Sequence, residues 1–195
     1  MRLLAFALLG ALALAGCRDE QAETSPPPQK LTASAIGHYC GMNVLEHIGP
    51  KGQILLASQT EPVWFSSARD AFSFTMLPEE PKDIRAIYVS DMAKAPSWEE
   101  PGESNWVEAR TAFFVIGSRM KGGMGADETV PFSEKPAAEN FAAANGGRVV
   151  TFDEMPRDYV LSAGAAGDPS ASDGSHSAGT GGTQQRSEDE QWRRR

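Results

Sequence analysis

Two sulfur-bearing side chains flank a single glycine in the segment Cys40-Gly41-Met42. A thiolate and a thioether are soft donors, and among the biologically common ions such donors select Cu(I). On an extended chain, residues i and i+2 point to the same face roughly 6–7 Å apart, which is wide for two sulfurs that meet one ion. Gly41 permits backbone conformations that curl the segment inward. The segment is therefore a candidate Cu(I) site.

A glycine-rich segment in the second half of the chain, RMKGGMG at residues 119–125, offers further sulfur donors. Two donors from one tripeptide leave an ion open to water, so more donors should come from elsewhere. Met124 lies beside glycine and away from any amphipathic face, which favours a ligand. For Met120 the ligand and core interpretations both stay open. For the other methionines the gap-filling core role is favoured, and these are Met76, Met92 and Met155.

The N-terminus indicates export. After Met1-Arg2, an apolar run from Leu3 to Ala15 leads to Gly16-Cys17. Such a run is too short for a stable transmembrane anchor and is typical of a signal peptide. The small residues before Cys17 resemble the lipobox of bacterial lipoproteins, so we expect residues 1–16 to be the signal peptide and Cys17 to carry lipid. An ordinary signal with an accidental cysteine is the alternative.

Lipid at Cys17 would leave Cys40 as the only thiol of the mature chain. An unpaired cysteine in an exported protein indicates intermolecular pairing or a reactive thiol, although free cysteines elsewhere are commonly small buried hydrophobes. Several acyl chains attach a protein stably to a membrane. We therefore expect a protein tethered on the periplasmic side of the cell envelope, and Arg18 in place of Asp after the cysteine favours the outer membrane.

Histidines could complete the donor set. His47 could be a ligand, a hydrogen-bond donor to a ligand or a turn residue, and His38 lies two residues before the thiol. His176 lies in the polar C-terminal stretch, where a solvated side chain is the default expectation. The formal net charge, −8 for the chain and −9 once Arg2 is removed with the signal, argues against nucleic acid as a partner.

Composition separates a folded part from two flexible ends. Residues 17–34 are polar and contain Pro26-Pro27-Pro28, which predicts a lipidated flexible tether. Residues 163–195 have almost no large apolar side chains and predict a disordered tail. Residues 35–162 remain as one compact domain.

The folded part shows one pattern twice, two strands, a helix and a third strand. In the first half these segments are residues 53–57, 62–65, a helix capped by Ser66 or Ser67 that ends near Pro78, and 84–89. In the second half they are residues 112–116, 129–132, a helix capped by Ser133 that ends at Asn145-Gly146-Gly147, and 148–152. The pattern predicts an α+β fold of two homologous ββαβ modules, at about residues 35–92 and 106–155.

Taken together, these features resemble the NosL family, copper lipoproteins of denitrifying bacteria. The resemblance covers nearly all of residues 36–155. Besides the lipobox it rests on Cys40-Gly41-Met42, His47, Gly49-Pro50-Lys51-Gly52-Gln53, Met124-Gly125, Val130-Pro131-Phe132, Gly146-Gly147-Arg148-Val149 and Phe152-Asp153-Glu154. Cys40 and Met42 match the family's Cys-Gly-Met element and Met124 its Met-Gly element, whereas the upstream methionine of the family's loop does not align cleanly with Met120.

The resemblance implies a fold of two homologous ββαβ modules and a function in copper delivery. It implies that Cu(I) is bound and passed to apo nitrous-oxide reductase, for assembly of that enzyme's copper–sulfur centre, together with an ABC-type membrane maturation complex. The leading hypothesis is thus a monomeric copper-transfer protein that is not an enzyme and works by ligand exchange. Its ligands would be Cys40, Met42, Met124, His47 and Met120.

Two other functions remain open. The first is an enzyme with Cys40 as nucleophile and His47 or His38 as base. A fold shared with organomercurial lyase would favour it, but that chemistry uses more than one cysteine, and no nucleophile elbow, phosphate loop or zinc motif occurs in the sequence. The second is a structural lipoprotein without metal whose thiol is simply buried.

Overall fold

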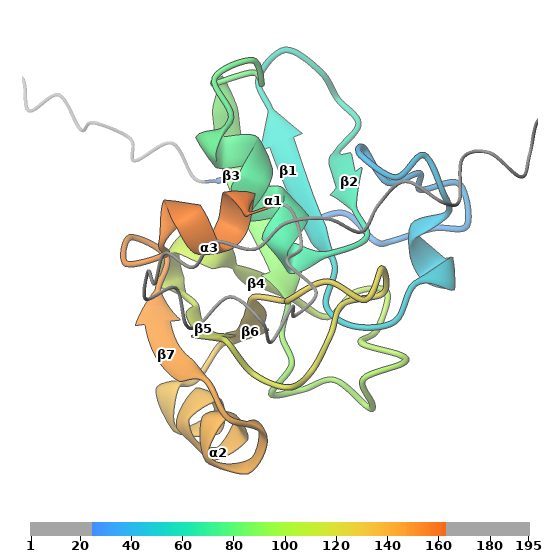
Figure 1. Cartoon of the computed structure of the whole chain (residues 1–195). Coiled ribbons are helices and arrows are strands. Elements are labelled where there is room, and N and C mark those ends of the chain that lie inside the picture. Colours follow the sequence, from blue (N-terminus) through green and yellow to red (C-terminus); the bar gives the residue numbers. More distant parts are fainter. Residues whose placement is uncertain (1–24, 163–195) are drawn as a thin grey trace, which may run out of the picture. The chain divides into compact units, whose positions relative to one another are not determined.

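The computed structural model describes residues 25–162 of the 195-residue chain (Figure 1). The strands are β1 (Gly52–Leu56), β2 (Val63–Phe65), β3 (Ile84–Ser90), β4 (Trp106–Glu108), β5 (Phe113–Ile116), β6 (Val130–Phe132) and β7 (Arg148–Thr151). The helices are α1 (Ala68–Met76), α2 (Lys135–Asn145), α3 (Arg157–Leu161) and the 3-10 helices η1 (Val44–Glu46) and η2 (Ala109–Thr111). Among the described residues, no helix has the length and apolar character needed to cross a membrane.

The two halves of the chain share one topology, which confirms the predicted repeat of ββαβ modules. The first sheet has the order β2-β1-β3-β4 and the second the order β6-β5-β7, and all strand pairs are antiparallel. In each module the first strand lies in the middle, the second strand pairs with one edge, and the strand that follows the helix pairs with the other. Strand β4 was not predicted. It extends the first sheet, with Val107 opposite Val89, so the predicted start of module two at residue 106 was wrong.

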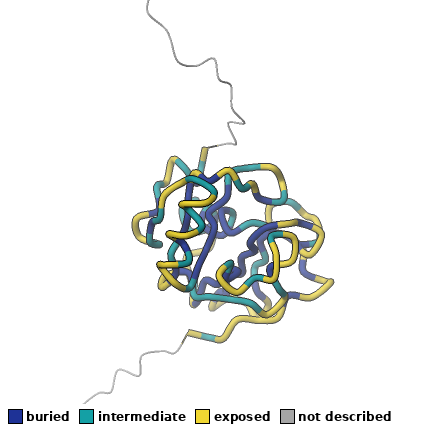
Figure 2. Tube along the Cα trace, turned by 90° about the horizontal axis from the view of Figure 1, so that it is seen from below, coloured by how far each residue is buried: buried dark blue, intermediate teal, exposed yellow. Residues whose placement is uncertain are grey.

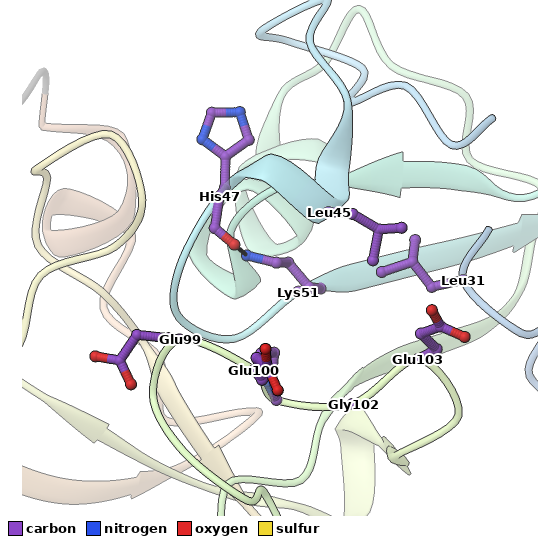
Figure 3. A pocket seen from close by; sticks show the side chains of 9 residues that line it. Leu31, Leu45, His47, Lys51, Glu99, Glu100, Gly102 and Glu103 are labelled. Atoms are coloured by element: carbon purple, nitrogen blue, oxygen red, sulfur yellow. Dashed lines mark hydrogen bonds between the residues drawn. The ribbon is translucent and has the colours of Figure 1, made fainter. Parts of the chain in front are cut away.

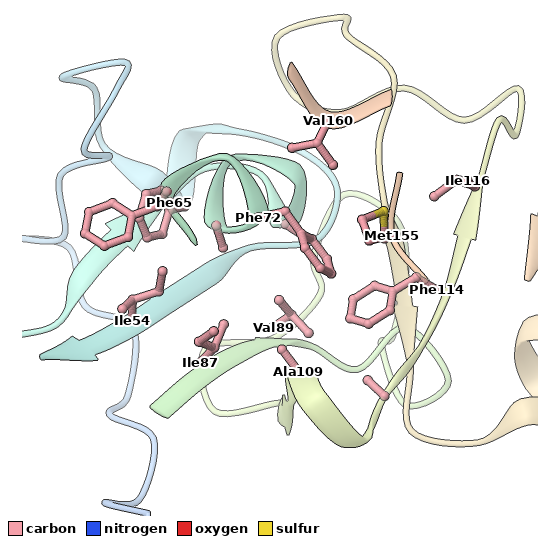
Figure 4. Close-up of a cluster of buried hydrophobic side chains, with 14 of the residues drawn as sticks. Ile54, Phe65, Phe72, Ile87, Val89, Ala109, Phe114, Ile116, Met155 and Val160 are labelled. Carbon is pink, nitrogen blue, oxygen red and sulfur yellow. The ribbon is translucent and has the colours of Figure 1, made fainter. Parts of the chain in front are cut away.

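One hydrophobic core joins both modules (Figure 4). Phe72 of α1 packs edge-to-face on Phe114 of β5, with ring centroids 4.9 Å apart, and stacks on Phe152 just after β7 at the same distance. Figure 2 shows the buried segments in the interior of the described fold and the exposed turns outside. Met155 lies in this core, and the partly buried Met76 packs against it. Met92 packs likewise against the smaller core beneath α2, so the three methionines assigned to packing are confirmed.

The two main helices begin in different ways. The Ser67 hydroxyl accepts a hydrogen bond from the Arg69 amide at 3.1 Å and caps α1, as predicted. The predicted cap of α2 was wrong, because the N-cap residue is Glu134 and its side chain makes no capping bond. Ser133 is engaged elsewhere, since its amide donates to Asp91 Oδ1 at 3.0 Å. Helix α2 ends as predicted at Gly146, which has φ +78°.

The segment from Pro26 to Ala35 is docked on the first sheet, although the sequence placed most of it in a flexible tether. The Gln53 side chain on β1 bonds both the amide and the carbonyl of Gln29, at 2.8 and 2.9 Å. Leu31 is only 2% exposed and packs with Ala35 and Val44 against two tryptophan rings. The predicted boundary was therefore wrong, and the ordered chain begins well before residue 35. The predicted signal peptide, the lipid site Cys17 and the tail with His176 lie outside the described residues.

We expect Leu31→Ala to lower the free energy of unfolding by about 2–5 kcal/mol, because it empties a fully packed position. Urea denaturation followed by tryptophan fluorescence measures the change. Thr32→Ala is the matched control, since Thr32 is exposed and its hydroxyl contacts only Ser34 at 2.9 Å. A Leu31→Ala effect as small as that of the control would show that this segment is not part of the folded unit.

Candidate metal centre

The loop that carries Cys40 is wound tightly on itself. The Gly37 amide donates to the Met42 carbonyl at 2.9 Å and the Gly41 amide to the Gly37 carbonyl at 2.8 Å. Gly41 has φ +65°, so the inward curl expected at this glycine is present. At Gly37 an added Cβ would lie 2.5 Å from Cys40 Sγ, so the sulfur fills the space above a residue that must lack a side chain.

The Cys40 sulfur is half-buried and faces polar groups. Its neighbours are Ser66 Oγ at 3.4 Å and His47 Nε2 at 4.0 Å. In zinc sites, bonds to imidazole nitrogen and thiolate sulfur are about 2.0–2.3 Å long. Two donors 4.0 Å apart can therefore reach one ion of similar size without backbone movement. The structure thus brings Cys40 and His47 together as a pair of donors.

His47 is held in place by hydrogen bonds of its backbone amide and carbonyl. It follows η1, whose N-cap Asn43 accepts a bond from the Leu45 amide at 2.9 Å, and the His47 amide donates back to the Val44 carbonyl at 3.3 Å. Its carbonyl accepts a bond from Lys51 Nζ, and Figure 3 shows the imidazole ring on the side away from that contact. The ring therefore faces the thiol while the carbonyl faces inward.

Lys51 is a buried cation beneath Cys40 and His47. The sequence analysis named it only as part of the family resemblance. Its side chain is 1% exposed, and Nζ donates to three carbonyls, those of His47, Ile48 at 3.1 Å and Ser66 at 3.5 Å. Burial lowers the pKa of Lys51 to about 8, against the attraction of Glu128 and Cys40, which raises it. The Lys51 ammonium group thus connects the segment of His47 and Ile48 with the segment of Ser66, and both segments lie next to Cys40 Sγ.

The loop that carries Met124 reaches the same place from module two. It is a tight turn in which Gly122 donates to the Ala126 carbonyl at 2.9 Å, and Met124 at its tip is 58% exposed. Gly123 lies directly on His47, because an added Cβ would stand 2.7 Å from the Cβ of His47 and 3.1 Å from its Nδ1. The loop that carries Met124 at its tip therefore contacts the histidine that lies 4.0 Å from Cys40 Sγ.

The remaining predicted donors differ in their surroundings. Met42 is 39% exposed beside Cys40, so neither Met42 nor Met124 serves the core. Met120 stands before the tight turn, where the amide of its neighbour Arg119 bonds to Asn145 at the end of α2. This contact does not involve the Met120 side chain, and Met120 stays a predicted ligand.

His38 is also engaged elsewhere, since its Nε2 lies 3.2 Å from Glu80 Oε1. Within residues 25–162, no group of three or more His, Cys, Asp and Glu side chains could hold a metal ion. More than two side-chain donors at this site therefore require the methionines.

Glu128 links the two modules behind the site, and the sequence analysis missed it. It is 1% exposed, and its Oε1 accepts bonds from the Arg69 amide at 2.9 Å and the Thr129 amide at 2.8 Å. Its Oε2 faces Gly122 of the Met124 loop, where an added Cβ would lie 2.7 Å away. Burial raises the pKa of Glu128 to about 7, although the two amide bonds lower it. An acidic residue directly before an apolar strand was the only signal in the sequence.

The chain is similar to proteins of one family. The NosL family model matches residues 28–160, a range that includes both loops of the site. The copper-binding lipoprotein NosL of Achromobacter cycloclastes is 45% identical over 152 residues, 77% of this chain and 79% of the relative. The copper-binding lipoprotein NosL of Stutzerimonas stutzeri is 32% identical over 158 residues, 80% of this chain and 81% of the relative.

A solved structure shares the fold. The crystal structure of the copper chaperone NosL from Shewanella denitrificans matches with a TM-score of 0.63 and 37% sequence identity. The match covers 68% of this chain and 98% of that structure. The predicted α+β class and the predicted resemblance are both confirmed by these comparisons.

The raised pKa of Glu128 predicts that stability falls with increasing pH. The folded state holds the proton up to about pH 7, whereas an unfolded glutamate releases it near pH 4.5. The free energy of unfolding should therefore decrease between these values by up to about 3 kcal/mol and then level off. In Glu128→Gln this decrease should be absent, and in Glu134→Gln, an exposed control, it should persist. Equal urea-derived pH profiles for Glu128→Gln and the unmodified protein would refute this role of Glu128.

Proposed function

This chain belongs to the NosL family, and we propose that it carries Cu(I) in the cell envelope and delivers it for assembly of the copper–sulfur centre of nitrous-oxide reductase. Two contacts support this above all. Cys40 Sγ lies 4.0 Å from His47 Nε2, and Gly123 of the loop that carries the exposed Met124 lies against His47. The relatives, described as copper-binding lipoproteins and a copper chaperone, point to the same cargo.

The donor types favour Cu(I) over other ions. Thiolate and thioether ligands are soft and suit Cu(I), while imidazole is compatible with copper in general. We assign Cys40 and His47 as the inner pair and Met42 and Met124 as the outer ligands. Hard-ion ligation is disfavoured, because no three His, Cys, Asp or Glu side chains within residues 25–162 are grouped so that they could hold a metal ion.

Delivery would proceed by ligand exchange that begins at the two exposed methionines. Met42 and Met124 are exposed at 39% and 58%, whereas His47 is 9% exposed and the thiol half-buried. A donor of the acceptor protein can replace the outer thioethers first, and the inner pair then releases the ion. Lipid at Cys17 would keep the carrier on the periplasmic side of the envelope, where apo nitrous-oxide reductase and an ABC-type maturation complex would receive the ion.

The neighbouring thiol and imidazole also fit a second candidate, a thiol-dependent enzyme with Cys40 as nucleophile. A nucleophile and its base usually approach to about 2.6–3.2 Å, and a third group orients the base. Here the two atoms are 4.0 Å apart, and Nδ1 of His47 faces Gly123, which has no side chain. The geometry therefore favours the carrier. Turnover of any thiol-dependent reaction that survives complete copper removal would favour the enzyme.

The proposed ligands can be separated by conservative substitutions. Cys40→Ala should weaken Cu(I) binding by at least about 100-fold, and Met42→Leu or Met124→Leu by about 10-fold, since leucine keeps the volume and removes the sulfur. Met76→Leu, at a methionine packed against the core, is the matched control and should bind as the unmodified protein does. Titration against a chromophoric Cu(I) chelator gives the affinities. Unchanged affinity in Cys40→Ala would end the proposal.

A substitution that removes no donor should also impair the site. In Gly123→Ala the new Cβ would overlap His47 and the Ile48 carbonyl, so the loop must withdraw and carry Met124 away. We expect an affinity loss of about 10–100-fold, similar to the loss of Met124 itself. The same chelator titration measures it, with urea denaturation to show that the fold is intact. If Gly123→Ala binds normally while Met124→Leu does not, the contact with His47 does not position Met124.

A further inference from the structure

The exposed large apolar side chains come from the two loops that carry the proposed donors. In the described part of the chain there are six, and five of them come from one short segment, residues 36–48, while the sixth is Met124. We call this set the apolar collar, and its members are Ile36, Tyr39, Met42, Leu45, Ile48 and Met124, each 39–58% exposed. Contiguous exposed apolar surface on a soluble protein marks an interaction site.

The collar residues are neighbours of the proposed donors along the chain. Tyr39 and Met42 flank Cys40 in sequence, and Leu45 lies on η1 just before His47. Ile48 follows His47, and its carbonyl stands 3.1 Å from the Cβ position of Gly123, at the base of Met124. A protein that brings a donor atom to this site would therefore meet residues of the collar.

An acidic pocket adjoins the collar at Leu45. Its volume is about 340 Å³, and it is also lined by Leu31, Glu99, Glu100 and Glu103 (Figure 3). Lys51 contributes a positive charge to its wall, but Nζ is directed to backbone carbonyls. The carboxylate of Glu103 pairs with Lys30 at 2.9 Å.

Two carboxylates of the acidic pocket remain without a counter-charge. Glu99 and Glu100 are exposed and form no ion pair within residues 25–162. The pocket therefore offers negative charge to an incoming cation.

We propose that the apolar collar and the acidic pocket together form the docking surface for the copper acceptor, a protein that presents its soft donor within an apolar patch and a lysine or arginine beside it. The basic side chain enters the acidic pocket while the patch covers the collar and excludes water from the exchanging ligands. This inference rests on the proposed function.

Charge selects this occupant over two others. A second copy of the chain would bring further negative charge to Glu99 and Glu100, since each copy carries a formal net charge of −8. An anionic membrane surface would be repelled in the same way. Like-charge contacts of this kind suppress wrong partners, whereas opposite charges steer the right one and raise the association rate.

The test measures copper transfer from the loaded carrier to copper-free nitrous-oxide reductase mixed with its solubilised maturation complex. Glu99→Lys combined with Glu100→Lys should slow transfer at least about 10-fold at low ionic strength, and the defect should shrink as salt is added. Leu45→Asp should slow transfer by a similar factor that salt does not restore. The matched control, Glu139→Lys combined with Asp153→Lys, makes the same charge change on exposed residues of module two and should transfer normally.

The two proposals can fail separately. Cu(I) affinity of each surface variant is titrated first and should equal that of the unmodified carrier, since none of these residues is a ligand. Binding of the copper-free carrier to the immobilised acceptor is measured in parallel. If Cu(I) is not bound but the surface variants still lose acceptor binding, the proposed function fails and the docking surface stands.

Three results would overturn the docking surface. The first is normal transfer and acceptor binding by both the charge-reversal and the Leu45→Asp variants. The second is a dimer of the unmodified carrier in sedimentation that Leu45→Asp dissociates, which would make a second copy the occupant. The third is binding of the carrier without its lipid to vesicles of anionic phospholipid that Leu45→Asp abolishes.

Discussion

The candidate site depends on one buried ammonium group. Lys51 Nζ bonds to the carbonyls of His47, Ile48 and Ser66, which belong to segments on two sides of the Cys40 sulfur. Burying a cation is costly unless its hydrogen bonds are made, so those three carbonyls are held where the ammonium needs them. Because His47 is fixed through its backbone, its ring needs no side-chain partner to face Cys40 Sγ at 4.0 Å. The polar bonds thus lie beneath the site, and the soft donors remain free at its surface.

The loops that carry Cys40 and Met124 are also constrained by close packing. Gly37 and Gly123 lie so close to Cys40 Sγ and to the Cβ of His47 that neither position has room for a side chain. The close approach places the donors together without any bond between them. Behind the Met124 loop, the carboxylate of Glu128 caps α1 from the other module through the Arg69 amide. The loop therefore rests on a rigid base formed by both modules, while its methionine at the tip stays exposed.

The sequence predicted those parts of the fold that local patterns determine. All strands except β4 and both main helices, with the start of α1 and the end of α2, follow from apolar periodicity, serine and glycine. What it missed depends on partners far along the chain. The segment around Leu31 looks like a linker until β1 presents Gln53 to its backbone. Ser133 looks like a cap until the Asp91 carboxylate takes its amide.

The candidate site likewise has features that the local sequence predicts and features that depend on residues far along the chain. Cys40 and Met42 are separated by one residue, so the sequence alone places them close together. The curl at Gly41 follows from the conformational freedom of glycine. The contact between Gly123 and His47 joins residues on two loops of different modules, and no local pattern encodes it. Lys51 and Glu128 are charged residues in positions that composition alone would place in solvent. Only the packing of both modules turns them into supports of the site.

The repeat explains why the candidate site lies at the start of α1 and has no counterpart at the start of α2. Strands β1 and β2 are joined by a short turn, residues 57–62, whereas β5 and β6 are joined by the longer loop of residues 117–129. That loop of module two crosses to the start of α1 in module one, and there it meets the segment before β1 that carries Cys40 and His47. The equivalent start of α2 is instead occupied by the loop after β3, through Asp91 and Lys94. The proposed donors therefore come from a segment before the first repeat and from a long loop within the second, and the repeated elements hold these two segments against one another.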